Sequence, residues 1–409
     1  MFERIFKLSE HKTTVKTEVM AGITTFMTMA YILAVNPSVL GSTGMDTTAV
    51  LLATALASCL GTLCMAFMAN LPFALSAGMG LNAFMAYTVV AGYGYSWQVA
   101  LFAVFIEGLI FIVLSLTNIR EAIFNAIPLT LKKGVSVGIG LFIAFIGLQN
   151  SGLCVDSATL VTIISFPENF HTAGICALLT LVGLFFTAVF YARKMKGAIL
   201  YGILLTWVLG MICQVTGIYV PTPDAGFYSL FPSWGMTDFS KLGLTFGQCF
   251  NLDFGAVGIV NFIVVIFSFL FVDIFDTLGT LIGVATKAKM LDKDGHLPGI
   301  KPALLADSIA TSAGAILGTS TTTTFVESAS GVAVGGRTGL TALVTGILFL
   351  VSTLFAPIFT AIPSFATAPA LIMVGFLMVG TVTEINFDLD NLTESIPAYL
   401  AIIAMPLFY

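Results

Sequence analysis

Apolar residues run in long blocks along almost the whole chain, and short polar stretches separate the blocks. A helix needs about 20 apolar residues to cross the roughly 30 Å hydrocarbon core of a bilayer, and most blocks approach or reach that length. Two further stretches, near residues 71–90 and 319–336, are shorter, rich in small residues and interrupted. The pattern therefore predicts long membrane spans near residues 19–40, 47–69, 97–117, 134–150, 172–192, 197–217, 255–286, 300–318, 339–357, 366–383 and 396–409.

Composition agrees with a polytopic membrane protein. Hydrophobic residues make up 58% of the 409 residues and charged residues only 9%, which is hard to reconcile with a soluble domain of this length. The basic start leads into polar residues without a cleavable apolar core, so the first span itself is expected to direct insertion. The net charge of -5 indicates no nucleic-acid partner, and the six cysteines lack metal-ligand spacing, so no cofactor or metal is expected.

Basic residues test the topology. If the N-terminus is cytoplasmic and both short stretches cross the bilayer, every lysine and arginine except Lys241 falls on the cytoplasmic side. Omitting one short stretch would place basic loops on both sides, against the positive-inside tendency. The sequence thus predicts thirteen spans in a multi-pass protein of the bacterial inner (plasma) membrane, with a cytoplasmic N-terminus.

The two interrupted stretches occupy matching positions. Each is the third span of its half, and a first half of seven spans makes the second half start on the opposite side, so the repeat is inverted. Paired interrupted segments at matching positions are a pointer to the binding site of a transporter. We therefore expect a solute to bind where these two stretches meet.

The second interrupted stretch carries a polar tract, residues 319–327, in which six consecutive hydroxyl residues are followed by Phe325, Val326 and Glu327. Hydroxyls and an acid inside a bilayer are costly and mark a functional site by default. The four threonines at 321–324 favour extended backbone before a helix restarts near Glu327. Extended backbone at that depth must be buried in protein or face a polar cavity, so this stretch is predicted to cradle a solute.

Helical rise places two acids at a similar depth. Glu327 and Asp276 lie ten and eleven residues before a basic residue at the predicted cytoplasmic edge, or roughly 15 Å inside. Asp273 lies one turn further out on the face of Asp276. Asp307 lies nearer the cytoplasm, and Glu107 lies well inside its own span, where an internal cap is an alternative role. Glu327 and Asp276 are thus the leading candidates to share one site.

Several segments together strongly resemble the adenine/guanine/hypoxanthine permease branch of the nucleobase:cation symporter-2 family. The resemblance covers nearly the entire chain, and the combination of motifs is specific although each alone is weak. The matching segments are residues 28–31 with Asn36 and Pro37, 77–84, 273–280, 318–328 and 335–339.

The resemblance implies a proton-coupled importer of purine bases, not an enzyme, with fourteen spans in two inverted seven-span repeats and interrupted spans 3 and 10. It implies a core domain, residues 1–120 and 251–356, that moves against a gate domain, residues 121–250 and 357–409. The family continues past the point equivalent to Tyr409, so the last gate spans are expected to be incomplete. A homodimer is implied by the resemblance alone.

The resemblance also implies site residues. It places the span-8 acid of the family on Asp276 or Asp273, the span-10 acid on Glu327 and the span-3 amide on Asn82; spacing to Glu327 favours Asp276 for the base. Alternating donors and acceptors on a purine edge suit carboxylates and an amide. The expected solute-binding residues are Glu327, Asp276, Asn82, Thr323 and Phe325, and the expected proton carriers are Asp273, Asp276 or Asp307.

Two rival interpretations are weaker. An anion transporter or exchanger of related architecture would place a basic side chain or only helix ends at the midplane, whereas this chain has acids there. An intramembrane aspartyl protease needs two aspartates on separate helices, whereas Asp273 and Asp276 share one. Adenine and the 6-oxopurines remain open alternatives, because one rotated amide reverses that choice.

Overall fold

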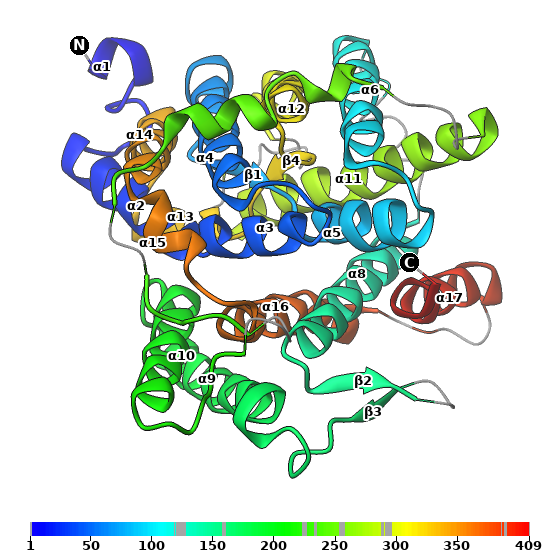
Figure 1. The fold of residues 1–409 in the computed structure, drawn as a ribbon. Helices are drawn as coiled ribbons and strands as arrows, with labels where there is room; N and C mark the ends of the chain where they lie inside the picture. Colours follow the sequence, from blue (N-terminus) through cyan, green and yellow to red (C-terminus); the bar gives the residue numbers. More distant parts are fainter. Residues whose placement is uncertain are drawn as a thin grey trace. The chain divides into compact units, whose positions relative to one another are not determined.

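The computed structural model describes residues 2–117, 119, 128–157, 161–222, 227–232, 235–252, 258–287, 290, 297–385, 387 and 391–408. Most of these residues are helical (Figure 1). Within the described residues, ten helical stretches are long and apolar enough to cross a bilayer. Two shorter apolar helices, Met79–Gly92 and Leu392–Leu407, coincide with the third and the last predicted spans. The prediction of an all-α polytopic membrane protein is confirmed.

Contacts divide the chain into two compact units. The first comprises Met1–Lys132 and Thr237–Ala356, and the second comprises Lys133–Met236 and Pro357–Tyr409. Each unit therefore combines one stretch from each half of the sequence.

The first unit opens with the elements of the first half. Thr14, Asp46 and Ser96 each cap a helix, because their side chains accept a hydrogen bond from a backbone N–H of the first turn. The elements are α1 (Phe2–Phe6), α2 (Val15–Met29), α3 (Ile32–Gly41), α4 (Thr47–Cys64) with a π-helical end η1 (Met65–Ala69), β1 (Leu75–Ala77), α5 (Met79–Ala83) with its π-helical continuation η2 (Phe84–Gly92), and α6 (Trp97–Leu116).

The second half contributes a similar series to the same unit. Two 3₁₀ turns, η5 (Phe239–Leu244) and η6 (Gln248–Phe250), come before its first long helix. The helices and strand that follow are α11 (Ile259–Lys287), α12 (Ile300–Leu317), β4 (Thr322–Thr324), α13 (Ser328–Val334), α14 (Gly339–Ser352), the 3₁₀ turn η7 (Thr353–Phe355) and the start of α15 (Ala356–Thr360).

The two interrupted spans join as a short antiparallel strand pair. Ser76 of β1 lies opposite Thr323 of β4, with Leu75 opposite Thr324 and Ala77 opposite Thr322. In Figure 1 the two strands lie among the helices of the first unit. The predicted extended segments are confirmed, and α13 restarts directly after Glu327.

A threonine from the preceding span forms hydrogen bonds to the backbone of each strand. Thr62 of α4 donates from Oγ1 to the carbonyl of Leu75 (3.2 Å) and accepts from the Leu75 N–H (3.0 Å). Thr311 of α12 donates from Oγ1 to the carbonyl of Thr322 at 3.0 Å. Extended backbone within a bilayer must find partners in protein, and these hydroxyls provide them.

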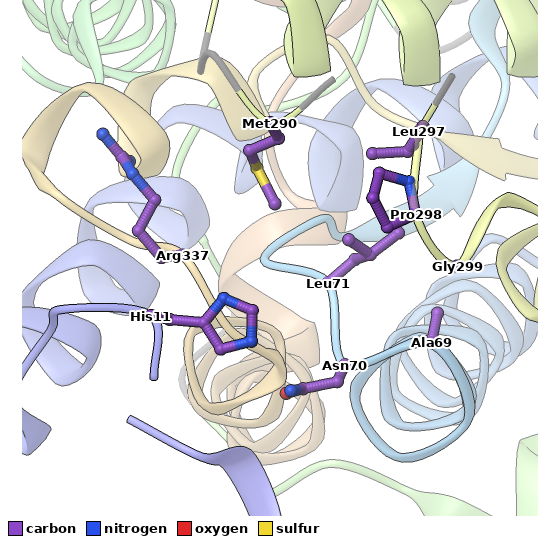
Figure 2. A pocket seen from close by; sticks show the side chains of 9 residues that line it. All are labelled: His11, Ala69, Asn70, Leu71, Met290, Leu297, Pro298, Gly299 and Arg337. Carbon is purple, nitrogen blue, oxygen red and sulfur yellow. The ribbon is translucent and has the colours of Figure 1, made fainter. Parts of the chain in front are cut away.

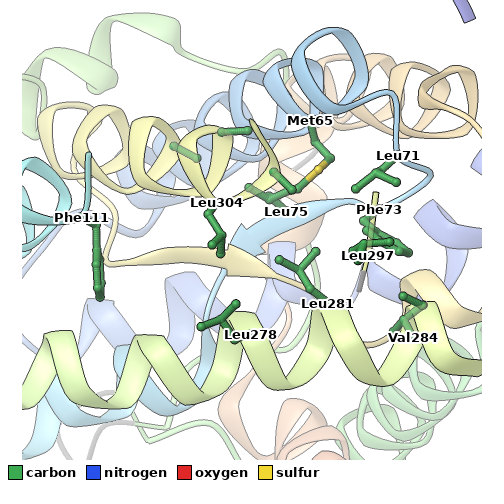
Figure 3. Packing of buried hydrophobic residues seen from close by; sticks show 14 of the residues in the cluster. Met65, Leu71, Phe73, Leu75, Phe111, Leu278, Leu281, Val284, Leu297 and Leu304 are labelled. Carbon is green, nitrogen blue, oxygen red and sulfur yellow. The ribbon is translucent and has the colours of Figure 1, made fainter. Parts of the chain in front are cut away.

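Apolar side chains surround the strand pair on the side of α11 and α12. Phe73 and Leu75 from the first interrupted span pack in one buried cluster with Leu278 and Leu281 of α11 and Leu304 of α12 (Figure 3). All five side chains are at most 2% exposed. This cluster fixes the strands against two helices that carry polar candidates, so packing positions the site.

The second unit is built from paired helices with small residues between them. Gly183 of α9 packs against Thr206 of α10, and Gly202 of α10 packs against Thr187 of α9, so an added Cβ at either glycine would collide. A short hairpin, with Val155 opposite Thr162, was not predicted from the sequence. The elements are α8 (Leu129–Asn150), β2 (Cys154–Asp156), β3 (Val161–Ile163), η3 (Phe170–Gly174), α9 (Ile175–Ala192), α10 (Ala198–Val215), α16 (Ser364–Val379), η8 (Gly380–Glu384) and α17 (Leu392–Phe408).

Candidate functional site

The strand pair commits much of its backbone to internal hydrogen bonds. Beyond the paired residues, the Gly78 N–H donates to the carbonyl of Thr321 (2.9 Å) and the Phe325 N–H donates to the carbonyl of Ala74 (3.0 Å). Together with the threonine braces, these bonds satisfy the extended chain at several points. Side chains around the pair are therefore the main candidates for contacting a solute.

Two predicted acids lie beside β4. Thr323, its middle residue, donates from Oγ1 to Oδ2 of Asp276 on α11 at 3.1 Å. Glu327 lies half-buried at the start of α13. Thr323, which contacts Asp276, lies four residues before Glu327 in the chain. Three of the predicted solute-binding residues are thus close together, although they come from two separate segments.

A tyrosine completes this group. Tyr31 lies between the end of α2 and the start of α3, is 1% exposed, and donates from its hydroxyl to Oε1 of Glu327 at 2.7 Å. One turn earlier, the hydroxyls of Thr28 and Ser330 are 2.8 Å apart. The first span therefore holds α13 by two polar contacts that the sequence analysis did not assign.

Asn82 lies on α5, fully buried, on the first interrupted span. Its Oδ1 accepts a hydrogen bond from the hydroxyl of Ser320, and its Nδ2 finds no partner among the residues that the structure describes. A buried donor left without an acceptor costs about 1–3 kcal/mol. A bound solute or a water molecule would supply that acceptor.

Phe325 joins the strand pair by its backbone. Its ring is 6% exposed and its N–H is already bonded to Ala74. In this structure the ring therefore serves packing, and a role in contacting a solute stays a prediction.

The three predicted proton carriers come from two helices. Thr277 of α11 lies 2.9 Å from Oδ1 of Asp273 and 3.0 Å from Oδ1 of Asp307 on α12, measured from its Oγ1. Both aspartates are fully buried. Asp276, one turn from Asp273, is near enough to Asp307 for their charges to interact. Thr277 thus links Asp273 with Asp307. Asp276, on the same helix, contacts Thr323 of β4.

Glu107 binds the second interrupted span from α6. Its Oε2 accepts a hydrogen bond from the hydroxyl of Thr321 at 2.8 Å, and the side chain is fully buried. This contact lies at the residue directly before β4. A bracing role for Glu107 agrees with this geometry.

Known proteins match the chain over almost its whole length. The model of a permease family matches residues 16–408. The guanine/hypoxanthine permease PbuO of Bacillus subtilis (strain 168) is 44% identical, over 98% of this chain and 89% of PbuO. The adenine permease AdeP of Escherichia coli (strain K12) is 42% identical, over 99% of this chain and 86% of AdeP. The chain belongs to the nucleobase:cation symporter-2 permease family.

A solved structure shares the fold of this permease. The transmembrane domain of the cyanobacterium bicarbonate transporter BicA aligns over 96% of this chain and 95% of its own, with a TM-score of 0.67 and 16% sequence identity. That likeness confirms the predicted inverted-repeat architecture and carries no information on the solute. Family membership makes the protein an integral multi-pass permease and excludes the protease alternative.

A pocket of about 360 Å³ lies elsewhere in the permease. Figure 2 shows that His11, Asn70 and Leu71 lie at this pocket, together with residues that precede α12. None of the predicted solute-binding or proton-carrying residues is among its lining residues, which are His11, Ala69, Asn70, Leu71, Met290, Leu297, Pro298, Gly299 and Arg337. We therefore keep the candidate site of this permease at the strand pair.

Sequence reasoning missed the residues that act on the predicted acids. Tyr31 and Thr28 belong to a segment that resembles the family, but nothing in the sequence connects them with Glu327, about 300 residues later. Thr277 lies within hydrogen-bond distance of two predicted proton carriers, and the matching segment 273–280 assigned no role to its hydroxyl. A signal was available only for Tyr31, as a polar aromatic residue inside an apolar span.

Proposed function

We propose that this permease imports purine nucleobases across the bacterial inner membrane together with protons. The observation that carries the proposal is the pair of carboxylates, Asp276 and Glu327, beside the paired interrupted spans. Two relatives are named a guanine/hypoxanthine permease and an adenine permease, which supports a purine as the solute.

The chemistry of the site suits a neutral purine base. Ionised carboxylates accept hydrogen bonds only, so Glu327 and Asp276 fit the ring and exocyclic N–H groups of a purine edge. Asn82 contributes a hydrogen-bond donor, because its buried Nδ2 has no acceptor among the described residues. An anionic solute would meet these two carboxylates, and Tyr31, Asn82 and Thr323 beside them carry no positive charge, which disfavours the anion-transport alternative.

Proton coupling is supported by the hydrogen bonds available to the Thr277 hydroxyl. Thr277 has one hydroxyl hydrogen but lies within hydrogen-bond distance of carboxylate oxygens of both Asp273 and Asp307. If both contacts are ordinary two-centre hydrogen bonds, one aspartate carries a proton and donates it to the hydroxyl oxygen of Thr277. We propose that the exchangeable proton resides on Asp273, Asp276 or Asp307 and that Glu327 holds the base.

The energetics of such coupling are adequate. One elementary charge crossing about 100 mV gains roughly 2.3 kcal/mol. Since about 1.4 kcal/mol is a factor of ten, one proton per neutral base would sustain roughly fifty-fold accumulation at that voltage.

Alternating access requires two bodies, and we propose that the core and the gate take this role. The core would comprise residues 1–120 and 251–356, and the gate residues 121–250 and 357–409. The candidate site residues all belong to the first compact unit, so in this proposal the solute travels with the core. A cytoplasmic N-terminus and a homodimer belong to the same proposal.

The test is uptake of radiolabelled hypoxanthine and adenine, in parallel, into cells that lack their own purine permeases. We expect uptake of at least one base and its loss when a protonophore collapses the proton gradient. Uptake that withstands the protonophore would overturn proton coupling. Uptake of neither base, with the protein shown in the membrane and no binding to the purified protein, would overturn the solute class.

A further inference from the structure

Tyr31 lies at the junction of α2 and α3 within the first span. α2 ends at Met29, α3 begins at Ile32, and the residues between them place the Tyr31 side chain in the interior at 1% exposure. A buried tyrosine hydroxyl usually finds a polar partner. Here that partner is Oε1 of Glu327, 2.7 Å away, from a segment 296 residues later in the chain.

This bond joins a neutral donor to the acid that would hold the base. A hydroxyl that donates to an ionised carboxylate forms a charge-assisted bond, roughly twice as strong as a neutral one. It also occupies one of the two carboxylate oxygens and restricts the side chain to one orientation. Oε2 of Glu327 is then the oxygen that remains for a solute.

A second contact between the same elements supplies a natural comparison. Thr28 of α2 and Ser330 of α13 lie with their hydroxyls 2.8 Å apart, so they brace α13 without contacting the Glu327 carboxylate. If the first span only supported α13 mechanically, loss of either contact would have a similar effect. If Tyr31 tunes the carboxylate, only loss of its hydroxyl would change how Glu327 responds to pH.

We infer that Tyr31 is a positioning residue of the solute site, whose hydroxyl fixes the orientation of the Glu327 carboxylate and aims its second oxygen at the N–H edge of the bound base. The inference rests on the proposed function, because it assumes that Glu327 contacts the base. It assigns a part of the recognition of the base to the first span, which also makes a polar contact to α13 through Thr28.

Among the residues that the structure describes, Asp276 on α11 is a further titratable group that acts on this pair. It is near enough to both Tyr31 and Glu327 for electrostatic interaction, and Asp307 on α12 lies near Asp276 in turn. A change in pH dependence must therefore be assigned to Glu327 rather than to these aspartates. Combining the tyrosine variant with Glu327→Gln provides that assignment.

The experiment is equilibrium binding of radiolabelled hypoxanthine and adenine to the purified full-length protein between about pH 5 and about pH 8. Binding, unlike uptake, does not depend on the proton gradient. For Tyr31→Phe we expect the base to bind about tenfold more weakly near neutral pH, since a hydrogen bond to a charged group is lost. As the pH is lowered, we also expect Tyr31→Phe to lose binding at a higher pH than the unaltered protein does. The reason is that the hydroxyl that donates to the Glu327 carboxylate is gone.

Three variants make the result specific. Tyr95→Phe removes a buried hydroxyl that has no partner among the described residues, and it should bind the base as the unaltered protein does. Thr28→Val should leave the pH dependence unchanged. In the Glu327→Gln background, adding Tyr31→Phe should cost less than it does alone, because the two residues act as one unit.

The outcomes separate the inference from the function on which it rests. If the unaltered protein binds a purine base and Tyr31→Phe binds it equally at every pH, the inference is wrong and the proposed function stands. If Tyr31→Phe and Thr28→Val weaken binding equally with no change in pH dependence, Tyr31 is only a structural brace and the inference is again wrong. If the unaltered protein binds neither base, the proposed function itself fails.

Discussion

The two interrupted spans have matching backbones and opposite chemistry. Each provides a three-residue strand, and Ser76 of the first lies opposite Thr323 of the second. Four residues after Ser76 the first span has Gly80, whereas four residues after Thr323 the second has Glu327. The first stretch brings small residues that allow close approach, and the second brings hydroxyls and an acid.

The threonines that hydrogen-bond to the two strands also differ between the repeats. Thr62 makes two hydrogen bonds to the backbone of β1, and Thr311 makes one to that of β4. The preceding span therefore supports its strand in both repeats. The inverted repeat thus duplicates a backbone arrangement. Most of the polar side chains lie on the second interrupted span, and the first contributes Asn82.

Among the variants that test this difference between the two spans, Glu327→Gln is expected to have the largest effect. The amide keeps the size of the side chain but removes its charge and half of its acceptor capacity. We expect purine binding to weaken by roughly 10- to 100-fold, as for a lost hydrogen bond to a charged group. Equilibrium binding to the purified protein measures this loss.

The matched control is Glu168→Gln, shortly before η3, the same chemical change at an exposed position of the other unit. It should bind as the unaltered protein does. Full binding by Glu327→Gln would mean that the second interrupted span does not carry the recognition chemistry, and the contrast between the two spans would lose its functional meaning.

Removing the braces tests the backbone side of the comparison. Thr62→Val leaves both the N–H and the carbonyl of Leu75 without this partner, whereas Thr311→Val affects one carbonyl. Each buried group left unsatisfied costs about 1–3 kcal/mol. We therefore expect Thr62→Val to lower the free energy of unfolding more than Thr311→Val does, as measured by thermal unfolding of the purified protein.

Thr88→Val is the control, because the buried hydroxyl of Thr88 has no partner among the described residues. That variant should unfold close to the unaltered protein. An unfolding temperature of Thr62→Val equal to that of Thr88→Val would show that the strand of the first repeat does not depend on its brace.

Much of this arrangement could be predicted from the sequence. Apolar blocks predict the long helices, and the run of threonines predicts the extended segment and the helix that restarts beside Glu327. Helical rise predicts a common depth for Asp276 and Glu327, and in the structure Asp276 contacts Thr323, four residues before Glu327. These features are local or periodic, so the sequence carries them directly.

The missing part consists of contacts between distant segments. Tyr31, Thr62 and Thr277 are common residues in apolar helices, and only the packing of the fold gives each a polar partner. The pairing of β1 with β4 likewise joins residues about 250 positions apart. The periodicity of a sequence does not identify a partner in a distant segment. For this reason the acids could be predicted, whereas the hydroxyls of Tyr31 and Thr277 that contact them could not.

The smallest expected effect concerns the start of the second span in each repeat. Asp46 caps α4 by accepting from the Ala49 N–H at 3.0 Å and from Lys241 Nζ at 3.0 Å, whereas Gly299 precedes α12 without a side-chain cap. Partial burial acts to raise the pKa of Asp46, but the Ala49 N–H and the Lys241 ammonium outweigh it and lower that pKa below its ordinary value.

A lowered pKa in the folded state means that the stabilisation is present above the ordinary carboxyl pKa and is lost as the pH falls through the lowered value. Asp46→Asn keeps the cap and removes the charge, so near neutral pH it should cost under about 1 kcal/mol, and less in high salt, because both partners are partly exposed. Thermal unfolding at neutral pH and below about pH 4 measures this difference, which should shrink in acid. A difference that stays constant with pH would mean that the cap, and not the charge, distinguishes the first repeat from the second at this end.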